Sequence, residues 1–423
     1  MISLPVIRSV RDVAEYQLCS GCGVCASVSP STIRMVDAVD HGRRPVLSGD
    51  GSDEASRRAL TACPGIELRH TFDESDPALI ASLRDAWGPV LGVWEGHAGD
   101  AAIRYAGSSG GAATALGLHA MERSGMHGVL HTAARPDVPY LNETVMSRTR
   151  EELLARTGSR YAPASPGDGL GMILAAPAPC VFIGKPCDVA GVQKARRLMP
   201  GLDDKLGLTI AFFCAGTPST RGTLELMKKV GVHDPGAVTS VRYRGNGWPG
   251  LWTVRWRERD GTPREATLTY DESWGFLQEF RPWRCGICPD HTGEFADVAV
   301  GDPWHQAPKD GEPGRSLIVA RTKRGLAAVH SAAETGYLVL TREDPELLPR
   351  SQPNLIRARG RLWGQMMAMR LARVPSPRYE GLPTRALWWG ALGVRAKIQS
   401  TVGTLRRVAR RGLRRRTPIG DAR

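Results

Sequence analysis

CVFIGKPCDVAGVQKARRL (residues 180–198) and LGLTIAFFC (residues 206–214) decide the fold of this 423-residue chain. Each opens with a short run of apolar residues, which predicts a buried strand. In the first stretch, a loop and then a helix from Asp188 to Leu198 follow the strand. We therefore expect an α/β fold in which loops at the carboxyl ends of strands build a site.

Four cysteines are placed at loops that follow predicted strands or turns: Cys187, Cys214, Cys285 and Cys288. Four thiolates from separated loops suit an iron–sulfur cluster or a tetrahedral zinc ion, and the pattern does not choose between them. Cys187 is expected near a helix N-terminus, which stabilises a thiolate, and Lys185 adds positive charge nearby. Cys180 is expected to pack inside its strand and is not assigned as a ligand.

A second set of cysteines lies in CSGCGVCASVSP (residues 19–30) and has the spacing of the bacterial ferredoxin loop C-x2-C-x2-C-x3-C-P: Cys19, Cys22 and Cys25. Ser29 stands at the fourth position, and its hydroxyl is a poor replacement for a thiolate. We therefore expect Cys63 to complete a [4Fe–4S] site. The alternative is a three-cysteine cluster with Cys63 merely buried.

The third signal is GSSGG (residues 107–111), which precedes a predicted Ala/Leu/Met-rich helix. Such a loop exposes backbone N–H groups beside the positive end of a helix dipole, an arrangement that holds phosphates. The loop is neither GxGxxG nor a P-loop. A tight turn that needs small residues for packing is therefore the alternative interpretation.

Composition narrows the class of protein. Hydrophobic residues make up 42% of the chain and charged residues 23%, as in ordinary globular proteins. There is no run of 18 apolar residues, and residues 1–16 lack the apolar stretch of a secretion signal, so we expect neither a membrane span nor secretion. Nine cysteines then indicate metal or redox chemistry in a reducing, cytoplasmic compartment.

The net charge of +13 is concentrated at the C-terminus. Residues 385–423 contain eleven Lys and Arg and one acid, a net charge of +10, which leaves +3 for the other 384 residues. A nearly neutral body argues against specific nucleic-acid binding. Apolar residues recur beside the arginines of residues 387–413, as in a basic amphipathic helix. We expect this tail to bind an anionic membrane or partner protein, or to be a solvated basic tail, and to be removable without loss of the cluster ligands.

These signals divide the chain into an N-terminal iron–sulfur segment (residues 1–80), a core (81–350) and a basic helical C-terminal extension (351–423). Within the core, a hairpin is expected to turn at Asp260-Gly261.

Eight motifs occur in the order seen in one known family: CSGCGVC, GSSGGAATA, GSRY, FIGKPCDVAG, FFCAG, GNGWPG, CGICPD and GDPW. Over residues 15–345 the chain resembles the coenzyme F(420) hydrogenase/dehydrogenase beta-subunit family, which includes formate dehydrogenase beta subunits and plant-type hydroxymethyl-chlorophyll reductases. The resemblance implies an iron–sulfur flavoprotein with a flavin-binding α/β core, a small N-terminal ferredoxin-like iron–sulfur segment and a helical C-terminal tail.

Carried over by this resemblance, two [4Fe–4S] clusters are held by two cysteine sets: Cys187, Cys214, Cys285 and Cys288 in the core, and Cys19, Cys22, Cys25 and Cys63 near the N-terminus. The expected surroundings of FAD are Ser108, Ser109, Gly110, Gly111, Arg160, Tyr161, Lys185, Asn246 and Trp248.

The resemblance also implies a path for electrons, along which the flow can run in either direction. Electrons from ferredoxin or another redox partner would cross both clusters to FAD, which exchanges a hydride with coenzyme F(420) or a similar organic acceptor or donor. Lys185 is the catalytic candidate, as a stabiliser of negative charge on reduced flavin, and His291 is the candidate proton donor. The alternatives are a sugar or tetrapyrrole substrate, and a non-catalytic electron-relay or zinc-stabilised subunit of a larger complex.

Overall fold

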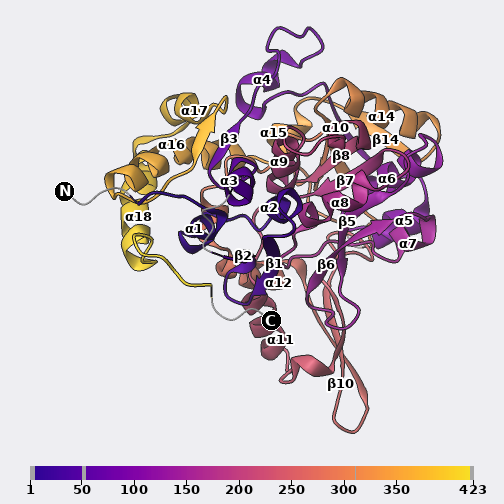
Figure 1. Cartoon of the computed structure of the whole chain (residues 1–423). Coiled ribbons are helices and arrows are strands. Elements are labelled where there is room, and N and C mark those ends of the chain that lie inside the picture. Colours follow the sequence, from indigo (N-terminus) through magenta and orange to yellow (C-terminus); the bar gives the residue numbers. More distant parts are fainter. Residues whose placement is uncertain (1–4, 50–53, 310, 420–423) are drawn as a thin grey trace.

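The structure, a computed structural model, describes residues 5–49, 54–309 and 311–419. Its centre is an eight-stranded mixed sheet in the order β14-β4-β13-β12-β8-β7-β5-β6 (Figure 1). The strands are β4 (Gly92–Ala98), β5 (Val129–Ala134), β6 (Asn142–Ser147), β7 (Cys180–Gly184), β8 (Leu206–Phe212), β12 (Val298–Gly301), β13 (Ser316–Ala320) and β14 (Leu338–Glu343). The four central strands β12, β8, β7 and β5 run parallel, and antiparallel pairs flank them. The predicted α/β class is confirmed.

Helices cover both faces of this sheet. One face packs against α5 (Ala101–Ala106), α6 (Ala112–Glu122), α7 (Arg150–Leu154) and α14 (Lys323–Glu334). The other packs against α4 (Ala81–Trp87), α8 (Leu170–Leu174), α9 (Pro186–Ala195), α10 (Leu202–Lys205) and α15 (Leu347–Ser351). Within β7, Val181 and Ile183 enter the first core and Cys180 and Phe182 the second. The apolar run at residues 180–183 is therefore continuous because both faces of the strand are buried.

The N-terminal segment packs on the second face. It contains α1 (Val10–Glu15), α2 (Val24–Val28), β1 (Ile33–Ala38), β2 (Gly42–Leu47), α3 (Glu54–Thr61) and β3 (Glu67–Arg69). Val24 and Val28 of α2 share a hydrophobic cluster with Val189 and Val192 of α9. The N-terminal cysteines are thereby fixed against the helix that begins beside Cys187.

A separate three-stranded sheet carries the expected hairpin. It is formed by β9 (Val238–Arg242), β10 (Trp252–Arg257) and β11 (Pro263–Leu268), and Gly261 has a φ of 86° in the turn. The sheet packs with α11 (Thr220–Lys229) and α12 (Tyr270–Leu277) around the fully buried Trp252.

The C-terminal extension contains α16 (Leu355–Leu371), β15 (Arg378–Glu380), α17 (Thr384–Ala391) and α18 (Val394–Arg410). The expected single basic helix over 387–413 is wrong in detail, because the chain breaks between α17 and α18 at residues 392–393.

This extension forms one layer with the N-terminal segment. Strand β15 pairs in parallel with β3, and yellow and indigo elements lie side by side in Figure 1. Residues from both ends of the chain join the cysteine-bearing 283–288 segment in one hydrophobic cluster, which includes Leu18, Cys19, Ile287, Met369 and Val408. We therefore expect that removal of residues 385–423 would uncover this cluster beside Cys19, contrary to our inference from the sequence that the tail is dispensable.

Candidate functional site

The carboxyl ends of β7, β8 and β12 meet at one edge of the sheet. They are followed by Cys187, Cys214 and Asp302, respectively. Cys285 lies in α13 (Trp283–Gly286), and Cys288 follows in the next loop. Cys187 interacts electrostatically with Cys214 and Cys288, and both of these interact with Cys285, so the structure brings the expected core set together.

The environment of this set favours a bound cation. Burial and the neighbouring Cys285 raise the pKa of Cys214 to about 12, and burial is the main cause that raises the pKa of Cys288 to about 11. Four clustered, half-buried thiols become thiolates together only when a cationic group compensates their charge. The Gly216 N–H donates to Cys214 Sγ at 3.4 Å, an outer contact of the kind that orients cluster ligands.

The structure also brings the N-terminal set together. Cys22 and Cys25 each interact electrostatically with Cys19 and Cys63, and burial raises the pKa of Cys63 to about 11. The position of Cys63 favours our prediction of a fourth ligand over a merely buried cysteine. Ser29 instead donates to the carbonyl of Ala55 at 2.8 Å.

Glycine is required in the N-terminal loop. Gly23 has a φ of 87°, and a Cβ there would lie 2.7 Å from both the Ser165 carbonyl oxygen and the Asp168 backbone nitrogen. The Gly21 N–H donates to Cys19 Sγ at 3.3 Å. The tight backbone therefore both fits the loop against its neighbours and supplies a donor to sulfur.

Within the described ranges, no group of His, Cys, Asp or Glu has an arrangement suited to a single metal ion. The donor chemistry of each cysteine set, four thiols with backbone N–H groups on sulfur, fits a [4Fe–4S] cluster. Cys180 interacts with neither set and remains a strand residue, as expected.

A cavity of about 290 Å³ opens at the same edge of the sheet. Its walls include six of the nine expected flavin residues, together with Cys214 of the core set: Ser108, Ser109, Gly111, Arg160, Tyr161 and Lys185. Gly111 is the N-cap of α6 at a φ of 73°, and no side chain caps that helix. The first N–H groups of α6 therefore lie beside the cavity without a side-chain partner.

The remaining three expected flavin residues do not line the cavity. A Cβ on Gly110 would lie 3.0 Å from the backbone of Arg315, so this glycine permits loop packing. Asn246 has a φ of 60° in the neighbouring loop. Trp248 is buried, and its indole N–H donates to Asp302 Oδ1 at 2.7 Å.

Arg160 lines the cavity but is engaged by the fold. Its guanidinium donates to Asn142 Oδ1 at 2.7 Å and to three backbone carbonyls: Pro139, Leu141 and Val241. Four donor contacts leave little of the Arg160 side chain for contact with FAD, which the resemblance implied.

Arg244 is a site residue that sequence analysis did not single out. Its buried guanidinium binds both carboxylate oxygens of Asp302, at 2.9 and 2.7 Å, and donates to the Ser108 carbonyl at 2.7 Å. It also donates to the Tyr161 hydroxyl at 3.1 Å. Arg244 thus joins the GSSGG loop to the end of β12. Its place directly before GNGWPG does not reveal these contacts, because Ser108 and Asp302 are distant from it in the sequence.

Lys185 is held in an ion pair at the cavity wall. Its ammonium donates to Asp188 Oδ2 at 2.7 Å and to the Ala164 carbonyl at 3.3 Å. Burial lowers the pKa of Lys185, but Asp188, Cys187 and Cys214 together raise it above its usual range. Lys185 therefore stays protonated between the core cysteine set and the cavity.

His291 also borders the cavity, and its Nδ1 donates to the Cys214 carbonyl at 2.7 Å. Burial lowers the pKa of His291, so the ring is neutral and the Nε2 atom is an acceptor. This tautomer makes His291 a proton acceptor at neutral pH, whereas we expected a donor.

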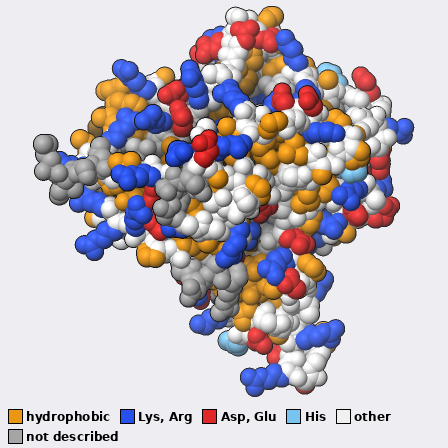
Figure 2. Space-filling model, viewed as in Figure 1, with side chains coloured by type: hydrophobic (Ala, Val, Ile, Leu, Met, Phe, Trp, Pro, Cys, Tyr) orange, Lys and Arg blue, Asp and Glu red, His pale blue; other side chains and the backbone are white. Residues whose placement is uncertain are grey.

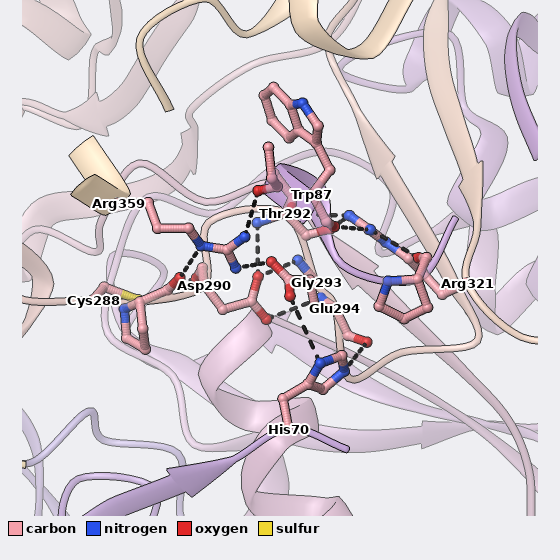
Figure 3. Close-up of polar contacts among 12 residues, drawn as sticks. His70, Trp87, Cys288, Asp290, Thr292, Gly293, Glu294, Arg321 and Arg359 are labelled. Atoms are coloured by element: carbon pink, nitrogen blue, oxygen red, sulfur yellow. Dashed lines mark hydrogen bonds and ion pairs between the residues drawn. The ribbon is translucent and has the colours of Figure 1, made fainter. Parts of the chain in front are cut away.

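A buried polar network fixes the loop behind Cys288 (Figure 3). Asp290 accepts hydrogen bonds from the N–H groups of Thr292, Gly293 and Glu294. Arg359 of α16 pairs with Glu294 and donates to the Pro289 carbonyl at 3.2 Å. The C-terminal extension therefore positions a cysteine of the core set.

Comparison with known proteins now identifies the family. The family described as coenzyme F(420) hydrogenase/dehydrogenase, beta subunit, matches residues 93–170 with its N-terminal part and residues 179–346 with its C-terminal part. The chain belongs to this family. The resemblance inferred from the motifs is confirmed, and the match contains the core cysteine set and all the residues that line the cavity except Gln352 and Leu355. Cys19, Cys22, Cys25 and Cys63 precede it.

Two curated members of the family are similar to the chain. It is 25% identical over 243 residues to the coenzyme F(420) hydrogenase subunit beta of Methanosarcina barkeri, covering 53% of this chain and 73% of that protein. It is 26% identical over 251 residues to the F(420)-dependent formate dehydrogenase 1 subunit beta of Methanococcus maripaludis, covering 59% of this chain and 61% of that protein.

A solved structure shows the same fold. A chain of the F(420)-reducing [NiFe] hydrogenase complex from Methanosarcina barkeri, studied by xenon derivatization, superposes with a TM-score of 0.51 at 20% identity. The match covers 69% of this chain and 95% of that one.

Proposed function

We propose that the chain is an iron–sulfur flavoprotein oxidoreductase that passes electrons between two [4Fe–4S] clusters and FAD and exchanges a hydride with coenzyme F(420) or a similar organic substrate. The observation that carries this proposal is the double position of Cys214, which belongs to the core cysteine set and also lines the cavity. A four-thiol site and a small-molecule site therefore share a wall. The names of the two curated relatives support the substrate class and another subunit as the redox partner.

The residues that would hold each group are distinct. The core and N-terminal cysteine sets would ligate one cluster each, and the uncapped N-terminus of α6 behind the GSSGG loop would hold phosphates of FAD. When bound, clusters transfer single electrons, and an isoalloxazine ring interconverts single-electron and hydride transfer.

The chain's own contribution is positioning and charge. The ammonium of Lys185 keeps a positive charge at the cavity wall, which favours an electron-rich occupant. Arg244 holds the Ser108 carbonyl and Asp302 in one arrangement, so the loop keeps its place beside α6. His291 presents an unprotonated Nε2 that accepts a proton at the same wall.

The test is anaerobic purification followed by iron, sulfide and flavin analysis. We expect about eight iron atoms per chain, sulfide in equal amount and one FAD, with a visible spectrum that dithionite bleaches. Coenzyme F(420) with a dye acceptor then tests the substrate. A colourless protein that binds two zinc ions and takes up no sulfide would overturn the proposal in favour of a zinc-stabilised subunit.

A further inference from the structure

Helix α18 buries small side chains and exposes large ones. The face that packs against α16 consists of Ala396, Ser400, Thr404 and Val408. The opposite face carries large apolar side chains that are 40–73% exposed: Val394, Ile398, Val402 and Leu405. Their spacing of four, four and three residues places them in one arc of the helix. An ordinary surface helix buries such an arc, so this one indicates an apolar partner outside the chain.

Unneutralised positive charge borders the apolar arc. The sequence from residue 381 to residue 420 has ten Lys and Arg and no acid, and Asp421 lies outside the described residues. In the described part of this segment, the ion pairs formed are those of Arg416 with Asp12 and Glu15. Arg395, Arg406 and Arg410 are exposed next to the arc. The surface therefore combines exposed apolar side chains with exposed arginines that can bind anions.

The neighbouring elements extend this surface. Trp389 of α17 is 63% exposed, and the Lys397 ammonium lies 4.9 Å from the centre of its ring. Hydrophobic and basic side chains intermingle over the edge formed by α16, α17 and α18 (Figure 2). Exposed tryptophan beside Lys and Arg is typical of helices that lie in the headgroup region of a bilayer.

We propose that α17 and α18 dock on a bilayer that carries anionic lipids, with the apolar arc at the headgroup boundary and Arg395, Arg406 and Arg410 at lipid phosphates. The geometry favours lipid over an acidic protein because the arc is the open, convex side of a single helix and lies between Trp and Arg side chains. No helix in the described ranges is long and apolar enough to cross a bilayer, so the contact is with one leaflet.

The experiment is sedimentation of the full chain with vesicles of phosphatidylcholine, with or without phosphatidylglycerol. We expect binding that requires phosphatidylglycerol and that disappears at about 1 M salt, where the screening length is about 3 Å. Ile398→Ser should weaken binding about ten-fold by removing an inserted side chain. Arg406→Glu with Arg410→Glu should weaken it at least about 25-fold.

The matched control for charge is Arg257→Glu with Arg259→Glu, on the exposed end of the β10–β11 hairpin, which should bind as the unchanged chain does. Iron and flavin contents of every variant show that it is folded. If the full chain stays in the supernatant with anionic vesicles at low salt, the proposal is overturned. An acidic protein is then the partner that the surface would bind. Binding that Ile398→Ser leaves unchanged also overturns it, because charge alone then explains the affinity.

Discussion

Gly191 of α9 lies directly against the thiol of Cys22: a Cβ built on Gly191 would be 3.4 Å from Cys22 Sγ. Cys187 precedes Gly191 by four residues on the same helix, a rise of about 6 Å along its axis. Further along α9, Lys194 donates to the Cys63 carbonyl at 3.0 Å. One helix therefore touches both cysteine sets, which places the two proposed clusters as neighbours.

The first prediction concerns this contact. Gly191→Val would also bring a side chain within 2.9 Å of Val24 Cγ2, so it should displace the loop that carries Cys22 and Cys25. We expect the loss of about half of the iron with FAD retained. Gly275→Val, in α12 with nothing within 4 Å, is the control and should keep all the iron. Full iron content in a folded Gly191→Val chain would contradict the neighbouring placement.

The second prediction separates ligand cysteines from a structural one. Cys285→Ser should remove about half of the iron, because serine replaces one thiolate of the core set. Cys180→Ser is the control. Cys180 is fully buried in β7 and interacts with neither set, so this variant should keep all of its iron. Iron analysis after anaerobic reconstitution measures both. Equal iron in the two variants would exclude Cys285 as a ligand.

The sequence predicted the parts of the site that depend on local pattern. Apolar runs located the central strands, and the carboxyl ends of β7 and β8 place Cys187 and Cys214 where an α/β sheet builds its sites. Both cysteine sets were recognisable because thiols are few and their spacing is informative.

Other features depend on pairing between distant segments and left no local signal. Strands β3 and β15 are three residues each and lie near opposite ends of the chain. The role of Arg244 depends on its contacts with Ser108 and Asp302, which only the fold brings to its guanidinium. In α18, the periodic apolar residues predicted a basic amphipathic helix, but they did not reveal that its small residues would pack against α16, which passes close at Gly364.

The third prediction concerns Arg244. Arg244→Met removes the partner of a carboxylate that is 17% exposed, which should lower the free energy of unfolding by about 3–5 kcal/mol and reduce bound FAD. Arg255→Met breaks an exposed pair with Glu265 and should cost less than about 1 kcal/mol. Urea unfolding and flavin content measure the two effects. Similar losses in both variants would show that the Arg244–Asp302 pair contributes no more to stability or to FAD binding than an exposed ion pair does.

The fourth prediction tests the flavin loop. Gly110 has a φ of 78°, and a side chain there would meet the backbone of Arg315, so Gly110→Val should shift the loop that carries Ser108 and Ser109. We expect release of FAD with both clusters in place. Gly171→Val, at an open position of α8, should retain FAD. Full FAD occupancy in a folded Gly110→Val chain would rule out this placement of the phosphates.

The fifth prediction concerns acid sensitivity. Burial, and then the charge of Arg156, lower the pKa of His131 to about 4, while its Nε2 is hydrogen-bonded to the Ser147 hydroxyl at 2.8 Å. The unfolded chain binds a proton near pH 6.5, and the folded chain does not until about pH 4. The contribution of His131 to the free energy of unfolding is therefore fully present above pH 6.5. It falls by about 3 kcal/mol in total as the pH drops from 6.5 through about 4.

His131→Gln keeps a polar partner for Ser147 but cannot take up the proton, so it should flatten the fall of the thermal unfolding midpoint between about pH 7 and about pH 5. The difference between the variant and the unchanged chain isolates this group from other buried histidines, such as His70. His233→Gln, at an exposed position, is the control and should follow the unchanged chain. Parallel pH profiles for His131→Gln and the unchanged chain would show that His131 is already protonated in the fold or that water reaches it.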